Sequence, residues 1–168
     1  TRKSNIRQLA KSMLEEHGGS CRCIRCREVG HNILKGIMPD PENITLTVEK
    51  YDCCSGVEHF ISFEDVRSDI LIGFLRLRFP HDPHRLELQN SALVRELHVY
   101  GSMVPVGENA KKCDWQHRGY GAELLNCAEE VTKDAGFKKI SVISGIGARE
   151  YYRRQGYMLD GVYMSKWF

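Results

Sequence analysis

The spacing of apolar residues predicts two main helices, one on each side of a strand-rich segment. In residues 4–17 the apolar positions recur every three or four residues, and Ser4 and the Gly18–Gly19 pair can cap and end this helix. A second helix is expected over 119–135, where Gly136 ends a similar pattern. Its apolar stripe consists of Leu124, Leu125, Ala128 and Val131.

Between these helices the period changes to two, which is the period of a half-buried strand. Apolar runs predict strands at 44–48, 59–63, 70–78 and 92–100. After the second helix, a short strand, a short helix and a closing pair of strands are expected at 139–144, 147–155 and 157–167. This order is typical of an α+β domain with a mixed, mostly antiparallel sheet flanked by helices.

The composition indicates one globular domain. The chain has 168 residues, of which 42% are hydrophobic and 27% charged, so disorder, collagen and coiled coil are disfavoured. A mean hydropathy of −0.40 and the lack of a long apolar run predict no membrane-spanning helix. The first residues, Thr-Arg-Lys-Ser, include no Met and no apolar stretch, so we expect the cut end of a longer chain rather than a signal peptide.

The charge and the cysteine content of the chain limit its possible binding partners and its cellular compartment. A net charge of +2, from 24 basic and 22 acidic residues, is too balanced to predict a polyanion partner by itself. Residues 1–30 are more basic, which fits either a nucleic-acid-binding face or a solvated surface. Seven cysteines without a secretory signal favour a reducing compartment, so we expect a cytoplasmic protein with no membrane partner.

Three cysteines form a Cys-x-Cys-x-x-Cys run, namely Cys21, Cys23 and Cys26. Thiolates at this spacing favour a tetrahedral zinc site. A fourth ligand is then needed, and the candidates are His17, His31, Cys53, Cys54 or a residue outside this chain. The alternative is three buried cysteines that bind no metal.

The most informative segment, Gln116-His-Arg-Gly-Tyr-Gly121, opens the second helix. The first turn of a helix has amides without backbone partners and a positive dipole end, and glycines at 119 and 121 let an anion approach them. Arg118 adds a charge. The segment therefore predicts a phosphate or diphosphate site, with a glycine turn before an ordinary helix as the alternative.

The spacing of Gln116, Gly119 and Gly121 resembles the diphosphate loop of the GCN5-related N-acetyltransferase (GNAT) superfamily. Downstream, the run from Ala148 to Tyr157 is similar to a second motif of that superfamily, Ala-x-x-Phe/Tyr-Tyr-x-x-x-Gly-Phe/Tyr. The resemblance implies a GNAT-like sheet that binds acetyl-CoA. The residues expected at this cofactor are Glu96, Leu97, His98, Val99, Gln116, Gly119, Tyr120, Gly121, Ala122, Glu123 and Tyr152.

Longer runs resemble one family within the superfamily, the tRNA uridine(34) acetyltransferases, which include the catalytic subunit of Elongator. These runs are Cys21–Gly30, Phe60–Glu64, Asp69–Arg78, Val94–Val106, Gln116–Gly121, Ile143–Gly147 and Tyr163–Lys166. They imply an N-terminal helix and zinc-binding linker over 1–40 and a GNAT acetyltransferase domain over 41–168. The family's radical-SAM domain, with its S-adenosylmethionine and iron–sulfur cluster, lies outside this sequence.

The resemblance implies an acetyl-CoA-dependent modification of the wobble uridine of tRNA. In the family, a carboxymethyl group is built at carbon 5 of the base together with the radical-SAM domain. The implied partners are tRNA, held mainly by that other domain, and other Elongator subunits if the source is eukaryotic. In this interpretation Lys11, Arg22, Arg25 and Arg27 extend the tRNA-binding face, whereas a solvated helix and loop surface is the alternative that this segment by itself slightly favours.

Three residues are candidates for the chemistry. From its place in the second motif, Tyr152 is expected to protonate the leaving thiolate, while Tyr151 packs. Glu96 and His98 lie on one side of a strand and act as a base or polarise a water. Alternatively, they are ordinary polar residues on the solvent side.

Two other functions fit the same residues. A lysine acetyltransferase acting on histone or other protein tails keeps the fold and changes the acceptor. A non-catalytic Elongator interaction module keeps the fold without the reaction, and a failure to bind acetyl-CoA would distinguish it.

Overall fold

The structure, a computed structural model, describes residues 5–101 and 119–168. Its helices are α1 (Ile6–Glu16), α2 (Ile24–Arg27), α3 (Val29–Ile33), α4 (Tyr120–Asp134) and α5 (Arg149–Arg154). Its strands are β1 (Ile44–Asp52), β2 (Gly56–Asp65), β3 (Ile70–Pro80), β4 (Ser91–Val99), β5 (Lys139–Val142), β6 (Met158–Asp160) and β7 (Tyr163–Trp167). No helix in the described ranges is long and apolar enough to cross a membrane.

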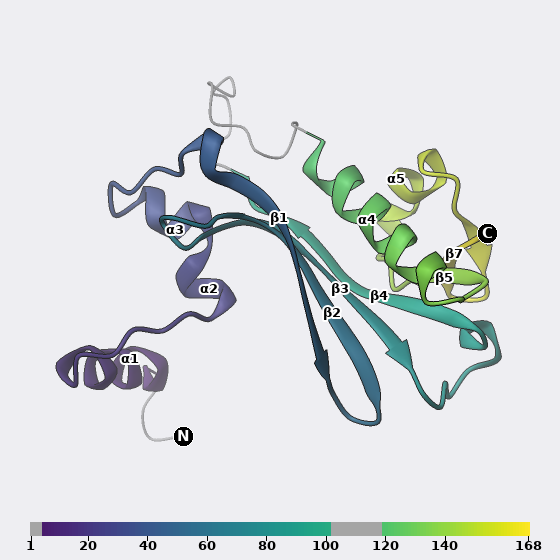
Figure 1. Ribbon diagram of the computed structural model, residues 1–168, viewed down its shortest axis with the longest axis horizontal. Helices are drawn as coiled ribbons and strands as arrows, with labels where there is room; N and C mark the ends of the chain where they lie inside the picture. The colour runs from purple at the N-terminus through teal and green to yellow at the C-terminus, as the bar shows by residue number, and fades with distance from the viewer. Residues whose placement is uncertain (1–4, 102–118) are drawn as a thin grey trace.

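The strands form one sheet in the order β1-β2-β3-β4-β5-β7-β6. Neighbouring strands are antiparallel except β4 and β5, which are parallel. A parallel pair needs a crossover connection, and α4 lies on the chain between these two strands. Figure 1 shows α4 lying along one face of the sheet, with α5 beside it. The predicted α+β fold with a mixed, mostly antiparallel sheet is therefore confirmed.

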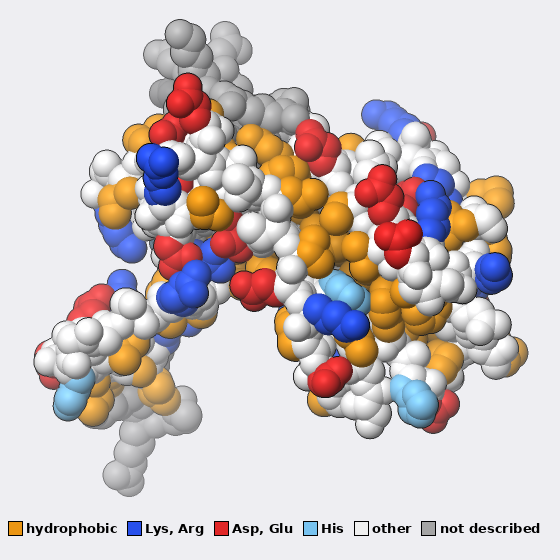
Figure 2. Space-filling model, in the orientation of Figure 1, with side chains coloured by type: hydrophobic (Ala, Val, Ile, Leu, Met, Phe, Trp, Pro, Cys, Tyr) orange, Lys and Arg blue, Asp and Glu red, His pale blue; other side chains and the backbone are white. Residues whose placement is uncertain are grey.

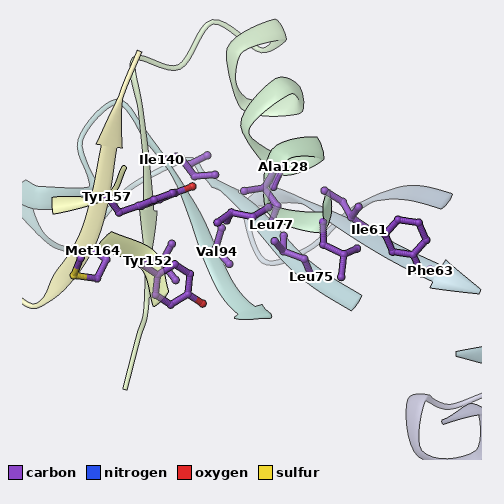
Figure 3. Close-up of a cluster of buried hydrophobic side chains, with 14 of the residues drawn as sticks. Ile61, Phe63, Leu75, Leu77, Val94, Ala128, Ile140, Tyr152, Tyr157 and Met164 are labelled. Carbon is purple, nitrogen blue, oxygen red and sulfur yellow. The ribbon is translucent and has the colours of Figure 1, made fainter. Parts of the chain in front are cut away.

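The core forms where α4 packs on the sheet. Leu124, Leu125 and Ala128 of its apolar stripe are fully buried, as the helical spacing predicts. They belong to one cluster with side chains from every central strand, including Ile61, Leu75, Leu77, Val94 and Ile140. Figure 3 shows this cluster continuing from Phe63 to Tyr157 and Met164. The core thus joins the strand-rich first half of the chain to the helical second half.

β1 is an edge strand and is covered less well. Its apolar residues Leu46 and Val48 pair with Phe63 and Ile61, yet they remain 42% and 46% exposed. In the space-filling view, hydrophobic side chains form a band between β1 and α4 (Figure 2). The cover that α4 gives to the centre of the sheet therefore does not extend over β1.

The N-terminal helix stands apart from the sheet (Figure 1). α1 matches the predicted range, but none of its residues is buried. Asn5 occupies the N-cap position without a side-chain hydrogen bond, and the expected cap, Ser4, lies outside the described residues. The apolar stripe that predicts this helix is therefore not buried by any part of the described chain.

The hinge between α1 and the sheet contains two short helices, α2 and α3, which the apolar pattern does not reveal. Val29 inserts into the core, and Glu28 forms a parallel bridge to Leu71 at the start of β3. Arg27 pairs with Glu64 and lies 2.8 Å from Asp69. The hinge is therefore attached to the sheet by one buried apolar side chain and a set of ion pairs.

Candidate functional site

The N-terminus of α4 presents amide groups next to two glycines. Gly119 has a φ of +84°, and its carbonyl accepts hydrogen bonds from the amides of Ala122 and Glu123 at 2.9 and 3.1 Å. No side chain caps this end, and the amides of Gly119 and Gly121 have no partner among the described residues. An anion at this end would meet unpaired donors and the positive end of the helix dipole.

Gly121 leaves space that any other residue would fill. A Cβ at this position would lie 3.1 Å from the hydroxyl oxygen of Tyr151 and 3.7 Å from Cγ2 of Val99. The backbone of Gly121 therefore approaches the side chains of Tyr151 and Val99 closely, and the absence of a Cβ leaves its amide accessible to an anion. The first-turn carboxylate of Glu123 opposes an anion here. Gln116 and Arg118 of the predicted loop lie outside the described residues.

β4 and β5 separate close to this helix end. They pair only from Ser91 to Val94, and the amide of Ile143 then donates to the carbonyl of Val94 at 3.1 Å. Beyond Val94, β4 continues to Val99 with β3 as its one neighbour among the described strands. The backbone of residues 96–99 therefore has an open side, which can bind amide groups by strand addition. Tyr120 lies at the other side of the helix start, with its ring 4.7 Å from that of Phe63.

The strand residues predicted at the site divide between the two faces of the sheet. Leu97 and Val99 pack against the core on the α4 side. Glu96 and His98 pair with Arg76 and Phe74, so they project from the opposite face, and both are exposed. The structure thus brings Glu96 and His98 together on one face, as the alternation predicts, but on the face away from α4.

A β-bulge sets which of the two faces each of these residues takes, and the apolar pattern of the sequence gives no sign of it. The register between β3 and β4 shifts at Arg76 and Leu77, so Arg95 has no direct partner. Arg95 instead pairs with Glu58, a β2 carboxylate that is 1% exposed and also lies 3.4 Å from Arg76. Burial opposes ionisation of Glu58, but Arg95 and Arg76 outweigh it and hold its pKa below the ordinary value. The only sequence signal was a glutamate at a strand position.

The two adjacent tyrosines of α5 occupy different environments. Tyr152 is 6% exposed and belongs to the core cluster, and its hydroxyl makes no hydrogen bond within the described chain. Burial raises the pKa of Tyr152 to about 12, so its phenol is protonated at neutral pH. Tyr151 is half-exposed beside Gly121, with its ring edge-on to that of Tyr152 at 5.2 Å. Both tyrosines therefore lie near the start of α4.

Tyr157, which lies in the same motif, has a structural role. Its hydroxyl donates to Glu129 of α4 at 3.0 Å, and Lys166 lies 2.7 Å from the same carboxylate. In Figure 3 the hydroxyls of Tyr152 and Tyr157 point in different directions. Because the hydroxyl of Tyr157 is bonded and that of Tyr152 is not, the two residues have different capacities to donate a proton.

The hinge cysteines lie together. The sulfur atoms of Cys21, Cys23 and Cys26 are within 4.8 Å of one another, which fits the donor set of a zinc site. Arg7 of α1 donates to Cys23 at 3.0 Å, and this contact is the main reason why the pKa of Cys23 falls to about 6. The three residues therefore form a compact group that can bind a soft or borderline metal ion.

None of the predicted fourth ligands joins this group in the described chain. His17 contacts the carbonyl of Met13, and Nδ1 of His31 lies 2.9 Å from Glu28. Cys53 and Cys54 lie at the β1–β2 turn. The described residues therefore supply three of the ligands that a tetrahedral site needs, and the notional fourth ligand comes from outside them.

The basic residues predicted on a tRNA-binding face are not equally available. Arg22 and Arg27 contact Asp69 at 2.9 and 2.8 Å and so attach the hinge to the sheet. Lys11 lies 3.6 Å from Glu15 on the same helix. Arg25 is exposed and has no ion pair within the described residues.

Comparison with known proteins agrees with this geometry. Residues 28–157 match the acetyltransferase (GNAT) family. The chain is 53% identical over 169 residues to the tRNA uridine(34) acetyltransferase of Methanocaldococcus jannaschii, covering 99% of this chain and 31% of that protein. It is 49% identical over 167 residues to Elongator complex protein 3 of Schizosaccharomyces pombe, covering 97% of this chain and 30% of that protein.

A solved structure is similar over the same range. The archaeal Methanocaldococcus infernus Elp3 with an N-terminal deletion superposes with a TM-score of 0.89 and 51% identity, covering 99% of this chain and 40% of that one. The chain thus spans about a third of the length of the curated relatives named above. Since the family match extends over most of the chain and the sheet and the α4 start agree with it, this chain belongs to the acetyltransferase (GNAT) family.

Proposed function

We propose that this chain is the acetyl-CoA-binding domain of an enzyme that modifies the wobble uridine of tRNA. The observation that carries the proposal is the opening between β4 and β5 beside the uncapped start of α4. Relatives with this domain are named tRNA uridine(34) acetyltransferases, which supports tRNA as the substrate. The domain boundaries that we propose are 1–40 for the helix and zinc linker and 41–168 for the acetyltransferase domain.

The free amides at Gly119 and Gly121 would hold the diphosphate of acetyl-CoA, together with Gln116 of the predicted motif. The open side of β4, over Glu96–Val99, would bind the amides of the pantetheine arm. Acetyl-CoA supplies an activated acyl group when bound. An arm that enters from the α4 side and follows this opening would bring its thioester towards the face from which Glu96 and His98 project.

In acyl transfer, one proton leaves the attacking group and one returns to the leaving thiolate. Glu96 or His98 would accept the first proton, directly or through a water. Tyr152 would donate the second proton, since its hydroxyl is protonated at neutral pH and has no hydrogen-bond partner in the described chain. Arg76, 3.7 Å from Glu96, would orient this carboxylate.

The remaining steps of the reaction would take place on other domains of the full-length protein. We propose that a radical-SAM domain with S-adenosylmethionine and an iron–sulfur cluster completes the carboxymethyl group, and that tRNA binds mainly there. Cys21, Cys23 and Cys26 would hold a structural zinc ion in the hinge. In a eukaryote the partners would include other Elongator subunits, and the enzyme would act in the cytoplasm.

The test is acetyl-CoA turnover by the full-length protein with and without tRNA. We expect turnover to rise when tRNA is added, and to remain low with lysine-containing peptides. Turnover that depends on a histone or other protein tail instead would favour a lysine acetyltransferase. An intact protein that binds no acetyl-CoA in calorimetry would favour a non-catalytic Elongator module.

A further inference from the structure

One side chain, that of Arg7, forms the polar contacts between α1 and the hinge cysteines. The helix stands apart from the sheet (Figure 1), and none of its residues is buried. Nη2 of Arg7 donates to the sulfur of Cys23 at 3.0 Å and to that of Cys26 at 3.5 Å. Within residues 5–101 and 119–168, no other side chain of α1 forms a hydrogen bond or ion pair outside the helix. The polar attachment of α1 therefore depends on two of the candidate metal ligands.

These hydrogen bonds are compatible with a metal ion on the same sulfur atoms. A thiolate sulfur has several lone pairs, so it can bind a metal ion and also accept an N–H group, and such hydrogen bonds adjust the properties of cysteine-ligated metal centres. The three sulfur atoms lie within 4.8 Å of one another, so Arg7 donates to the same group of atoms that fits a zinc ion. Arg7 and the metal ion therefore do not exclude each other.

The charge of a zinc site with three thiolates favours a cation beside it. Three thiolates and one Zn²⁺ leave one negative charge when the fourth ligand is neutral. A guanidinium keeps its positive charge at any pH near neutrality and presents several N–H donors in a rigid plane. Arg7 can therefore balance this charge and donate to the sulfur atoms at the same time, and hydrogen bonds between charged groups are the stronger ones.

Other cations lie near the cysteines without contacting their sulfur atoms. Lys11, Arg25 and Lys35 line the same hollow as Arg7 and Cys26. Lys11 lies 3.6 Å from a glutamate of its own helix, and the side chains of Arg25 and Lys35 form no hydrogen bond or ion pair with any described residue. Arg7 therefore differs from these neighbours by a directed contact with the sulfur atoms, and not by its charge alone.

We propose that Arg7 hydrogen-bonds the metal-bound sulfur atoms of the hinge, and that metal binding at the hinge thereby fixes the position of α1. The proposal rests on the part of the proposed function that assigns zinc to Cys21, Cys23 and Cys26. It goes further because it links the metal centre to an exposed helix. α1 supplies an outer partner to the metal ligands, and the metal centre in turn holds a helix that has no buried residue.

The first test measures the zinc affinity of the full-length protein by competition with a chelator. Arg7→Gln should lower this affinity by about tenfold, because loss of an outer hydrogen-bond partner typically weakens metal binding by about 10- to 100-fold. Lys11→Gln removes the same charge from the same helix and the same hollow without removing a contact with sulfur, so it is the matched control and should keep the wild-type affinity. Wild-type affinity in Arg7→Gln, or an equal loss in both variants, would overturn the proposal.

Cobalt substitution gives a spectroscopic measurement that a merely structural role of Arg7 would not change. An N–H···S hydrogen bond lowers the energy of the sulfur lone pairs, so the thiolate-to-Co(II) charge-transfer band should move to longer wavelength in Arg7→Gln and stay in place in Lys11→Gln. Subtracting the spectrum of the zinc-loaded protein removes the absorption of other chromophores. A band at the wild-type position in Arg7→Gln would contradict the contact with the metal-bound sulfur atoms.

Hydrogen exchange tests the link between the metal and the helix. Adding zinc to metal-free wild-type protein should slow exchange of the α1 amides severalfold, and Arg7→Gln should lose this protection. If zinc binds to the wild type and leaves the exchange of α1 unchanged, the link is wrong while the zinc assignment of the proposed function still stands. If the wild type binds no zinc, that assignment and this proposal both fail, whereas acetyl-CoA turnover continues to test the rest of the proposed function.

Discussion

Tyr152 and Tyr157 lie in the same motif with their rings 5.9 Å apart, but their hydroxyls have different surroundings. Tyr157 donates to the buried carboxylate of Glu129, which fixes the end of α5 against α4. Tyr152 has a protonated hydroxyl with no partner in the described chain. The difference makes Tyr152 the better candidate for a proton donor, and it leads to a kinetic prediction.

Tyr152→Phe should lower kcat for acetyl-CoA turnover by about 10²-fold or more, because general acid catalysis contributes at least that factor. KM should change little, since the hydroxyl acts on the leaving group. As the pKa of Tyr152 is about 12, wild-type turnover should show no loss from this residue up to pH 10. Steady-state kinetics from pH 6 to 10 would check this. A large loss in Tyr151→Phe and none in Tyr152→Phe would transfer the role to Tyr151.

Asp65 is a second residue whose environment leads to a measurable effect. It is fully buried and accepts hydrogen bonds from the amides of Asp40, Arg67 and Ser68 at 2.9, 3.0 and 3.1 Å. Burial raises its pKa, but these hydrogen bonds outweigh burial and hold the pKa below the ordinary value. A lowered folded pKa contributes stability above the unfolded pKa of about 3.9, and this stability is lost as the pH falls.

Asp65→Asn should therefore destabilise the protein by about 1–3 kcal/mol at pH 7, which is the cost of weakening a charge-assisted buried network. The difference from wild type should shrink as the pH falls below about 4, where the wild-type carboxylate becomes protonated. Urea unfolding at several pH values measures both effects. A difference that stays constant down to pH 3 would contradict the ionised state of Asp65.

At the scale of elements, α4 combines two tasks that can be separated experimentally. Its middle buries Leu124 and Leu125, whereas its start leaves amides exposed beside Gly121. A glycine inside a helix lowers stability by about 1 kcal/mol relative to alanine. Gly121 is therefore unfavourable for the helix, and the space it leaves next to Tyr151 gives a functional reason for it.

Gly121→Ala should raise or preserve thermal stability while weakening acetyl-CoA binding by about tenfold. The added Cβ would lie 3.1 Å from the Tyr151 hydroxyl, in the space proposed for the diphosphate. Calorimetric titration and thermal unfolding of the same variant separate the two effects. Unchanged affinity would show that the diphosphate binds elsewhere.

The hinge contains the cysteine cluster and also attaches α1 to the sheet. We expect about one zinc ion per chain by elemental analysis, and Cys23→Ser should lower this content severalfold because the remaining two thiolates are a poor site. Cys53→Ser, at the β1–β2 turn, is the matched control and should retain the metal. Equal metal content in Cys23→Ser and wild type would contradict the proposed site.

At the scale of the whole molecule, ion pairs decide how the hinge is held on the sheet. Arg27 and Glu64 are 12% and 13% exposed, so this pair is largely shielded from water. Arg22 makes a similar pair with Asp69, but it is 71% exposed. Buried pairs are costly to break because one charge is left without a partner, whereas exposed pairs contribute little.

Arg27→Ala should therefore destabilise the protein by about 2 kcal/mol and loosen α2 and α3, while Arg22→Ala should cost less than about 1 kcal/mol. Urea unfolding measures the stability, and hydrogen exchange reports on the hinge amides. Similar losses in the two variants would show that burial of the Arg27–Glu64 pair does not control the attachment.

The sequence alone determined the strands, the two long helices and the family. The changes in apolar period identified every strand of the sheet and both long helices, because period depends only on neighbouring residues. The Gly119–Gly121 spacing and the run ending at Tyr157 identified the acetyltransferase motifs for the same reason, since each lies within one short segment. The Cys21–Cys26 cluster was also local, and the structure brings its sulfur atoms together.

Only the tertiary structure decided which of these residues face one another. The bulge at Arg95, whose side chain pairs with the distant Glu58, sets Glu96 and His98 on the face opposite α4. Two of the arginines predicted to meet RNA, Arg22 and Arg27, are instead paired with the carboxylates of Asp69 and Glu64. Strand pairing and the burial of charged groups depend on residues that are far apart in the sequence. A pattern of neighbouring residues therefore cannot predict them.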